Sequence, residues 1–265
     1  MLKANYHTHT SFCDGINTPE EIVQAALEMG IEHLGFSGHV DISPVMDVRA
    51  YLSEIRRVQE KYRDRLDILC GGELDNMYHE RNQKGFDYLI GSVHHMKAGD
   101  EIIAVDWKEE MFLHLLNDYY CGDGYKLCRD YFRLTAETYG KGKCDWIGHY
   151  DLITRFNNKF RYVDENDSKY LDPAYEVLEY LVQEELLLEV NTKLADQGRI
   201  YPSKMILKKL KELNGRIIFS SDAHRAVDLL HGFDQGIEHA RACGFDRASI
   251  LTGENGRIRL VEISI

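Results

Sequence analysis

Two histidine-containing motifs stand near opposite ends of the sequence: Tyr6-His7-Thr8-His9 and Ser221-Asp222-Ala223-His224. Side chains alternate along a strand with a period of two, so a His-x-His pair points both imidazoles to the same side and can place two ligands in one pocket. Mixed imidazole and carboxylate ligands suit zinc, manganese or iron. Clusters of such ions activate water and bind phosphoryl oxygens. The motifs therefore indicate a polynuclear metal site with hydrolytic chemistry.

The segments that must position these residues alternate between strand-like and helix-like patterns. After the first His-x-His run, Thr18, Pro19 and Glu21 predict a capped helix that ends at Gly30. Apolar runs predict strands at 33–39, 68–73, 87–94, 146–149, 186–191 and 216–221. Helical periodicity or composition predicts helices at 47–65, 107–140, 173–185, 203–213 and 235–243.

This alternation predicts an α/β fold, because strands joined by helical crossovers pair in parallel. About seven such units favour a closed barrel over an open sheet. In a βα barrel the active site lies at the carboxyl ends of the strands. Eight polar residues fall at those predicted ends: His7, His9, His39, Glu73, His94, His149, Asp222 and His224. Chance does not readily place imidazoles and carboxylates at one strand end after another.

The remaining histidines fit ordinary positions in helices and loops or beside them. We expect no site role for five of them: His33, His79, His114, His231 and His239. His95 is ambiguous, because it adjoins His94 but should point away from it on a strand.

Length and composition favour one domain spanning residues 1–265, since 44% of its 265 residues are hydrophobic and can form a sizeable core. No apolar run approaches the roughly 20 residues of a membrane span, and no signal peptide is recognisable, so we expect a soluble cytoplasmic protein. The six cysteines form no C-x-x-C pair, which disfavours a thiolate zinc site and a secreted disulfide scaffold. The net charge of −12 disfavours nucleic acid as a partner.

Together these motifs resemble the PHP family, the polymerase and histidinol phosphatase group of metal-dependent phosphoesterases. The matching segments occur in the family's order and span nearly the whole chain. They are His7-Thr8-His9 with Asp14-Gly15, Gly38-His39, Gly72-Glu73, Gly91-Ser92-Val93-His94, Gly148-His149-Tyr150-Asp151 and Ser221-Asp222-Ala223-His224.

The resemblance implies a distorted (β/α)7 barrel that holds three divalent ions of zinc, manganese or iron. The first ion would be held by His7, His9, Glu73 and Asp222. Glu73 would bridge to a second ion held by His94 and His149, and the third would be held by Asp14, His39 and His224. The phosphatase branch often has a third histidine where this chain has Asp14. The Asp14 carboxylate is either an oxygen ligand or part of the turn that Asp-Gly favours.

Within the family, the motifs that end in His94 and begin at Gly148 look most like the histidinol-phosphate phosphatases of histidine biosynthesis. The resemblance then implies hydrolysis of L-histidinol phosphate to L-histidinol and phosphate, with Glu73, Asp222 and His224 as catalytic residues. A metal-bridging hydroxide would attack phosphorus in line. Two alternatives stay open: a phosphoesterase acting on phosphotyrosine, a sugar phosphate or a nucleotide diester, and a non-catalytic metal-binding barrel.

Positively charged side chains should complete the phosphate site, because the planar guanidinium of arginine matches two phosphate oxygens. The candidates are Arg155, Arg199 and Arg225, each of which follows a predicted strand end. The cationic end of the small-molecule substrate would need a carboxylate or aromatic partner, for which Asp106, Trp107 and Glu109 are the candidates. The oligomeric state stays open at this point.

Overall fold

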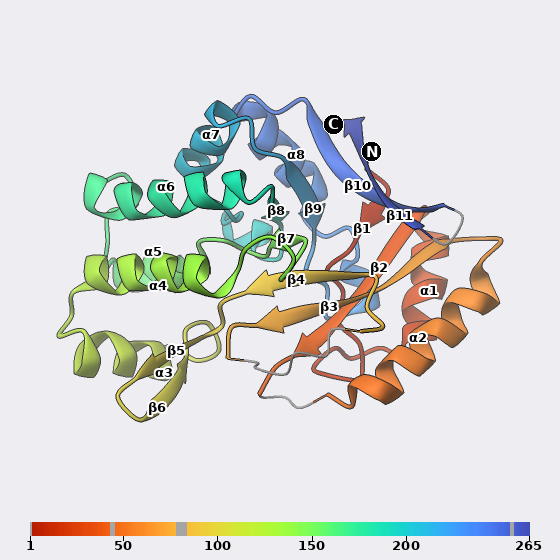
Figure 1. Ribbon diagram of the computed structural model, residues 1–265, viewed down its shortest axis with the longest axis horizontal. Coiled ribbons are helices and arrows are strands. Elements are labelled where there is room, and N and C mark those ends of the chain that lie inside the picture. The colour runs from red at the N-terminus through yellow and green to blue at the C-terminus, as the bar shows by residue number, and fades with distance from the viewer. Residues whose placement is uncertain (1, 43–45, 78–83, 255–256) are drawn as a thin grey trace.

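A curved sheet forms the centre of the computed structural model, which describes residues 2–42, 46–77, 84–254 and 257–265 (Figure 1). Nine described strands follow the order β1-β2-β3-β4-β7-β8-β9-β10-β11. The first seven of these run parallel: β1 (Ala4–Asn5), β2 (His33–Val40), β3 (Asp67–Asp75), β4 (Tyr88–Ser92), β7 (Trp146–Ile147), β8 (Leu187–Asn191) and β9 (Ile217–Ser220). β10 (Arg247–Glu254) pairs parallel with β9 and antiparallel with β11 (Arg257–Ser264).

The parallel strands close on themselves beyond the ends of β1 and β9. Thr8 forms a parallel bridge with Ala223. The amide of His9 donates to the carbonyl of Ala223 at 2.8 Å, and the amide of Ala223 donates to the carbonyl of His7 at 3.1 Å. The predicted distorted (β/α)7 barrel is therefore confirmed, and its seam is made by the two histidine-containing motifs.

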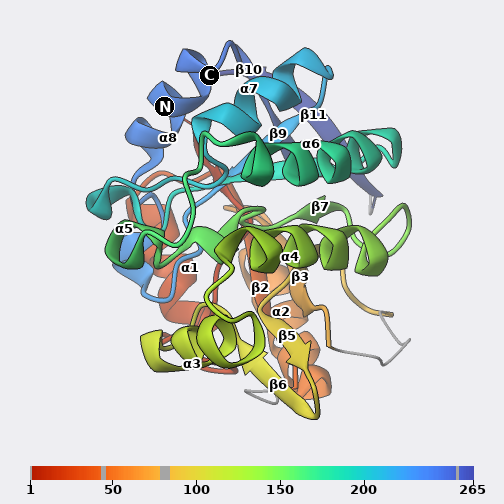
Figure 2. The same ribbon diagram turned by 90° about the vertical axis from the view of Figure 1, so that its left-hand side faces the viewer.

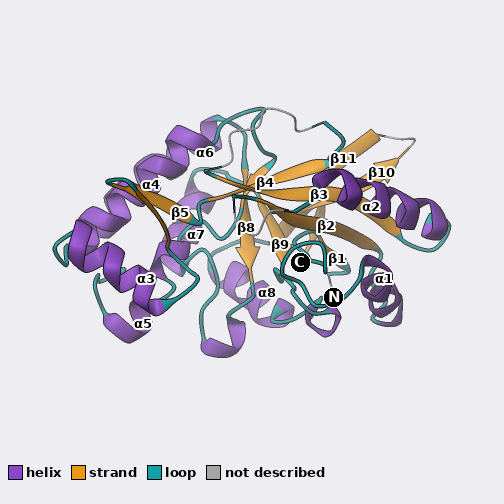
Figure 3. Ribbon diagram, turned by 90° about the horizontal axis from the view of Figure 1, so that it is seen from below, coloured by secondary structure: helices purple, strands orange, loops and turns teal. Residues whose placement is uncertain are grey.

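Helices surround this sheet, and Figures 2 and 3 show them from two further directions. The α-helices are α1 (Pro19–Glu28), α2 (Val48–Tyr62), α3 (Glu109–His114), α4 (Gly124–Thr138), α5 (Asn157–Phe160), α6 (Ser168–Gln183), α7 (Lys204–Glu212) and α8 (Phe233–Ala242). Short η elements complete them: η1 (Leu115–Tyr119), η2 (Leu152–Thr154), η3 (Ala195–Gln197) and η4 (Ala226–Asp228). No helix among the described residues is long and apolar enough to cross a membrane.

Local sequence signals explain where several helices begin. The capping box predicted for α1 is present, since the Glu21 amide donates to the Thr18 hydroxyl at 3.3 Å and the Thr18 amide donates to the Glu21 carboxylate at 2.9 Å. α6 begins at Ser168, five residues before the predicted start at Pro173, because the Asp167 carboxylate accepts the amide of Lys169 and caps the helix upstream.

Two regions differ from the sequence-based prediction. The predicted helical stretch 107–140 is three elements, α3, η1 and α4, interrupted by a turn in which Cys121 and Gly122 both adopt positive φ. Residues 95–104 form the unpredicted hairpin of β5 (His95–Ala98) and β6 (Glu101–Ala104), and the chain ends in the unpredicted β10–β11 pair. Both strand pairs are antiparallel and lie outside the βα repeat on which the prediction rested.

Aromatic side chains fill the barrel interior below the strand ends. The Tyr88 ring stacks on Trp146 at a centroid distance of 4.8 Å, and its hydroxyl donates to the carbonyls of Tyr6 and Phe36. A Cβ at position 71 would lie 2.2 Å from the Tyr88 ring, which explains the glycine there. This packed layer supports the strand ends that carry the polar residues.

The seam generates a stability prediction at Asn5. Its buried side-chain amide donates to the Ser221 hydroxyl at 2.9 Å and to the carbonyl of Leu229 at 3.0 Å. Asn5→Ala removes these bonds and also leaves the buried amides of His7 and Ser221 without the Asn5 Oδ1 atom that accepts them at 3.3 Å. We therefore expect a loss of about 2–4 kcal/mol in the free energy of unfolding. Urea-induced unfolding of the protein, after a chelator has removed its metal ions, measures this loss. The exposed Lys3→Ala control should lose less than about 1 kcal/mol, and equal losses would contradict the role assigned to Asn5.

Candidate metal centre

The strand ends bring the predicted site residues to one side of the barrel. His39 and Glu73 lie near the ends of β2 and β3. Four others lie exactly two residues beyond a strand, after β1, β4, β7 and β9: His7, His94, His149 and Asp222. His9 and His224 follow two residues later. β4, β7 and β9 are thus shorter than predicted, and the short extensions beyond them carry the polar side chains inward.

Glu73 lies at the centre of the cluster, with only 1% of its surface exposed. Its Oε1 lies 3.0 Å from Nε2 of His149 and 3.2 Å from Nε2 of His94. The same oxygen lies 3.3 Å from Nε2 of His7. The Oε2 atom lies 3.0 Å from Nδ1 of His39 and 3.5 Å from Nε2 of His9. One carboxylate therefore faces imidazoles that come from four strand ends and the extension of β1.

A second group forms around Asp14. Its Oδ2 lies 3.1 Å from Nε2 of His224 and 3.4 Å from Nε2 of His39, and its Oδ1 lies 3.6 Å from Nδ1 of His9. The turn also exists, since the Gly15 amide donates to the carbonyl of Thr10 at 3.1 Å. The two interpretations of Asp14 are thus compatible, because the turn directs its carboxylate at the histidines.

Asp222 completes a third group with the His-x-His pair. Its Oδ1 lies 3.2 Å from Nε2 of His9 and 3.8 Å from Nε2 of His7. Asp222 and His149 both have positive φ, 50° and 22° respectively. Non-glycine residues seldom adopt this backbone, and such positions are concentrated at functional sites. The local backbone therefore turns sharply where these two side chains enter the cluster.

The donor atoms of the cluster fit bound divalent ions. His7 Nε2, His9 Nε2 and Glu73 Oε2 are buried without a hydrogen-bond partner in the described structure. Unpaired buried polar atoms are costly, so several at one point need an explanation. Ligands on one tetrahedral zinc ion are separated by about 3.4 Å, as follows from metal–ligand distances near 2.1 Å. Many of the separations above lie near that value, and imidazole with carboxylate is a suitable donor set.

The electrostatics of the cluster keep its carboxylates ionised. Burial alone raises the pKa of Glu73, but His7, His94 and His39 hold it well below its usual value. Burial likewise opposes ionisation of Asp222, whereas Lys193 and His7 lower its pKa. Ionised carboxylates are the form that binds metal ions.

Sequence reasoning missed Glu189, which supports the cluster from β8. Its buried Oε1 lies 2.7 Å from Nδ1 of His7, and its Oε2 accepts the amide of His149 at 2.9 Å. The Ser220 hydroxyl and the Asn191 amide also donate to this carboxylate. A charged residue inside the apolar run Leu187–Asn191 was the available signal. Glu189 therefore orients two predicted ligands, His7 and His149, and is not itself one of the predicted ligands.

A cavity of about 380 Å³ opens above the cluster. Lys193, also missed, lines it with its Nζ 3.1 Å from Oδ1 of Asp222. Three of the candidates for substrate contacts, Arg155, Asp106 and Trp107, line the same cavity. Glu109, at the start of α3, instead forms an ion pair with Lys159 of α5 and is absent from the lining.

Two predicted phosphate-binding arginines require correction. Arg199 is 9% exposed, and its guanidinium forms an ion pair with Glu165 and donates to the Thr154 hydroxyl, outside the cavity lining. The side chain of Arg225 is 58% exposed and pairs with Asp228 three residues later. Each guanidinium is held by a nearby carboxylate. The position of an arginine after a predicted strand could not reveal such a pairing.

The histidines for which we expected no site role lie away from the cluster wherever the structure describes them. His33 pairs with Asp67, His114 with Glu101 and Asp118, and His239 donates to the carbonyl of Pro202. His231 lies 3.7 Å from Asp196, away from the cluster, and His79 lies outside the described residues. His95 lines the cavity, with Nδ1 3.1 Å from Oδ2 of Asp75.

Comparisons with known proteins agree with this geometry. The sequence model of the PHP domain matches residues 5–193. Histidinol-phosphatase of Bacillus subtilis is 25% identical over 271 residues, which cover 90% of this chain and 99% of the relative. Histidinol-phosphatase of Lactococcus lactis subsp. lactis is 29% identical over 242 residues, covering 85% of this chain and 86% of the relative.

A solved structure shares the fold. It is histidinol phosphate phosphatase from Lactococcus lactis subsp. lactis, complexed with zinc, L-histidinol and phosphate. It matches this structure with a TM-score of 0.73 at 23% identity, over 97% of this chain and 99% of that chain.

Glu189 generates a prediction about metal affinity. Glu189→Gln keeps the shape of the side chain but removes the charge that holds the His7 imidazole, so we expect metal affinity to fall about 10–100-fold. Titration against a metal buffer measures this. Glu176→Gln, an exposed position on α6, is the matched control and should leave affinity unchanged. A Glu189→Gln protein that binds metal like the control would show that this carboxylate does not position the ligands.

Proposed function

This chain belongs to the PHP family, and on that basis we propose that it is a phosphomonoesterase that hydrolyses L-histidinol phosphate to L-histidinol and phosphate. We propose also that residues 1–265 form one PHP domain, since the cluster draws on positions from His7 to His224. The relatives described above carry the histidinol-phosphatase name over 85–90% of this chain, which supports this substrate.

The observation that carries the proposal is the convergence of nine predicted ligands, seven of which line one cavity. Groups of their donor atoms lie within 4.8 Å of one another: His9, Asp14, His39 and His224; His7, Glu73 and His149; and His7, His9 and Asp222. His94 approaches both Glu73 and His149. A set this large exceeds what one ion requires, because zinc usually takes four ligands.

We propose that the cluster holds three divalent ions, with zinc, manganese and iron as the candidates. Glu73 would bridge two of them, since its two oxygens face different imidazoles. When bound, such ions supply hydroxide at neutral pH and neutralise charge on phosphoryl oxygens. Glu73, Asp222 and His224 are the residues to which we assign catalytic roles, because each faces the open cavity.

The cavity walls suit the two ends of the substrate. Arg155 and Lys193 offer positive charge to a phosphate group bound over the cluster. Asp106 and the exposed Trp107 offer a carboxylate and an aromatic surface to the ammonium and imidazole end. The cavity therefore offers both cationic groups and an acidic and an aromatic group to one ligand.

The proposed substrate is tested by measuring the phosphate that the metal-reconstituted enzyme releases from different phosphoesters. We expect kcat/KM for L-histidinol phosphate to exceed that for a simple aryl phosphate, because only the former carries groups that Asp106 and Trp107 can recognise. Preference for the aryl phosphate, a phosphotyrosine peptide, a sugar phosphate or a diester would overturn the proposed substrate. It would leave the proposed phosphoesterase activity in place. Metal binding without turnover on any of these would favour a binding protein.

Metal content provides a separate prediction. We expect close to three divalent transition-metal ions per chain by elemental analysis, because nine predicted ligands are more than two four-coordinate ions require. Chelation should abolish phosphate release, and added zinc or manganese should restore part of it.

Two variants sharpen this measurement. Glu73→Gln should lower both metal content and turnover, whereas His114→Ala, at an exposed histidine paired with Glu101, should change neither. One ion or none per wild-type chain after growth with ample metal would refute the three-ion cluster.

Arg155 provides a prediction about the phosphate site. Arg155→Ala removes a charge-assisted contact worth about 1.5–3 kcal/mol, so we expect kcat/KM to fall about 10–100-fold. Arg225→Ala is the control, because Arg225 pairs with Asp228 and does not line the cavity. Steady-state kinetics on L-histidinol phosphate compare the two. Equal losses would mean that Arg155 does not contact the phosphate.

A further inference from the structure

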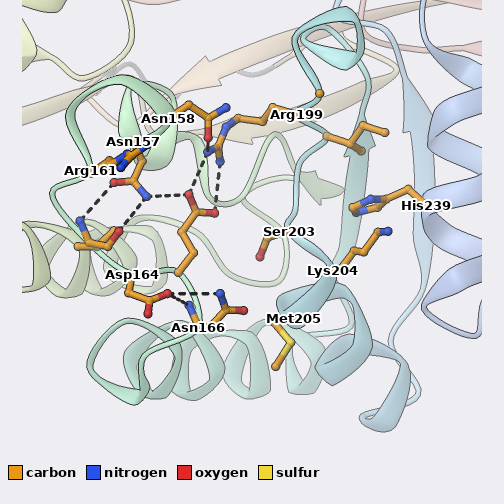
Figure 4. Close-up of a pocket in the computed structure, with 14 residues that line it drawn as sticks. Asn157, Asn158, Arg161, Asp164, Asn166, Arg199, Ser203, Lys204, Met205 and His239 are labelled. Atoms are coloured by element: carbon orange, nitrogen blue, oxygen red, sulfur yellow. Dashed lines mark hydrogen bonds and ion pairs between the residues drawn. The ribbon is translucent and has the colours of Figure 1, made fainter.

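A second polar cavity, of about 640 Å³, lies apart from the metal cluster. Its walls come from α5 and the loop that follows it, from the segment after η3, and from the beginning of α7 with His239 of α8 (Figure 4). None of the nine predicted metal ligands is among its lining residues. Its volume lies within the range of small-molecule sites.

One wall is a rigid hydrogen-bond network that leaves little net charge. Arg199 donates to both oxygens of Glu165, at 2.9 and 3.3 Å, and to Oδ1 of Asn158 at 2.9 Å. Asn157 donates to the same carboxylate at 2.8 Å. Figure 4 shows these contacts gathered at one end of the cavity. Arg199 and Glu165 therefore compensate each other and fix the shape of this end.

The opposite wall offers hydrogen-bond donors that lack partners. α7 is a nine-residue helix whose N-cap residue, Ser203, makes no side-chain capping bond, so the first-turn amides remain open. The Ser203 hydroxyl is itself buried without a partner in the described structure. On the first wall, Arg199 is nine-tenths buried, and its Nε has no partner among the described residues. Unsatisfied buried groups that line a cavity point to a ligand.

The remaining charges favour an anion. Arg161 and Lys204 line the cavity, and neither has a carboxylate within ion-pair distance in the described part of the chain. Asp164 is the opposing charge, and it already accepts hydrogen bonds from Asn166. The positive end of the α7 dipole adds to the two cations, and the buried Asp151 carboxyl group, outside the cavity lining, accepts the Ser203 amide at 2.9 Å. A locally positive cavity is unexpected on a chain with a net charge of −12.

We propose that this cavity is a second binding site, for a small molecule that carries a carboxylate or phosphate group. The acidic group binds the amides at the start of α7 beside Lys204, and the rest of the molecule extends toward Arg161 and the Arg199–Glu165 network on the other side of the cavity (Figure 4). This site does not depend on the proposed reaction, because it shares no lining residue with the metal cavity.

Titration of the ¹⁵N-labelled, zinc-loaded full chain tests the proposal. The probes are succinate and, in a separate arm, inorganic phosphate, with uncharged succinamide as the control ligand. We expect saturable shifts of the Lys204 and Met205 amide signals with at least one acid and none with succinamide. Saturation by succinate alone or phosphate alone identifies which acidic group the site prefers. Since succinate is not a phosphoester, the result is independent of whether the chain hydrolyses L-histidinol phosphate.

Charge-neutralising variants give the decisive comparison. Arg161→Asn with Lys204→Gln should weaken binding about tenfold or more, since two charge-assisted contacts are lost. Asparagine suits position 161 because its φ is 50°, in the left-handed region. Lys208→Gln, on the same helix and outside the cavity, should bind like the wild type. Absence of saturable shifts at the α7 amides, equal binding by succinamide, or equal affinity of the double variant and Lys208→Gln would each overturn the proposal.

Discussion

The structure depends on the burial of an ionised carboxylate, Glu73, in the middle of the barrel mouth. A buried charge is costly unless opposite charge or hydrogen bonding compensates it. Here the compensation comes from imidazoles on the surrounding strand ends, and Glu189 adds a second buried carboxylate behind His7. Imidazoles pointing unpaired nitrogens at such a carboxylate form an arrangement that divalent ions complete. The polar cluster and the closed barrel therefore require each other.

Barrel closure brings the two most distant motifs into register. The bridge between Thr8 and Ala223 lies between the residues that carry the clustered side chains, so each motif supplies backbone pairing and ligands together. The tyrosine and tryptophan layer beneath keeps these extensions in place. Rigid support of this kind holds metal ligands in a fixed geometry.

Much of this arrangement could be predicted because it follows from repeating patterns. The His-x-His pair, the capping box of Thr18 and Glu21, and polar residues at successive strand ends each have a local signature in the sequence. Contacts between distant segments have none. The sequence could not show that Glu165 holds Arg199, that Asp228 holds Arg225, or that Glu189 faces His7, since each depends on how loops pack in three dimensions. The β5–β6 hairpin was missed because it interrupts the βα repeat.

The bridge at the seam also bears on how the protein is made. A ribosome releases the His-x-His motif first and the Asp222–His224 motif more than 200 residues later. Until then, the strand extension that carries His7 and His9 lacks its partner, and these histidines lack Asp222. Domains generally fold as units during synthesis. In this chain the complete cluster cannot assemble before residues 222–224 have left the ribosome, so the ligands near the amino terminus must wait for those of the distant motif.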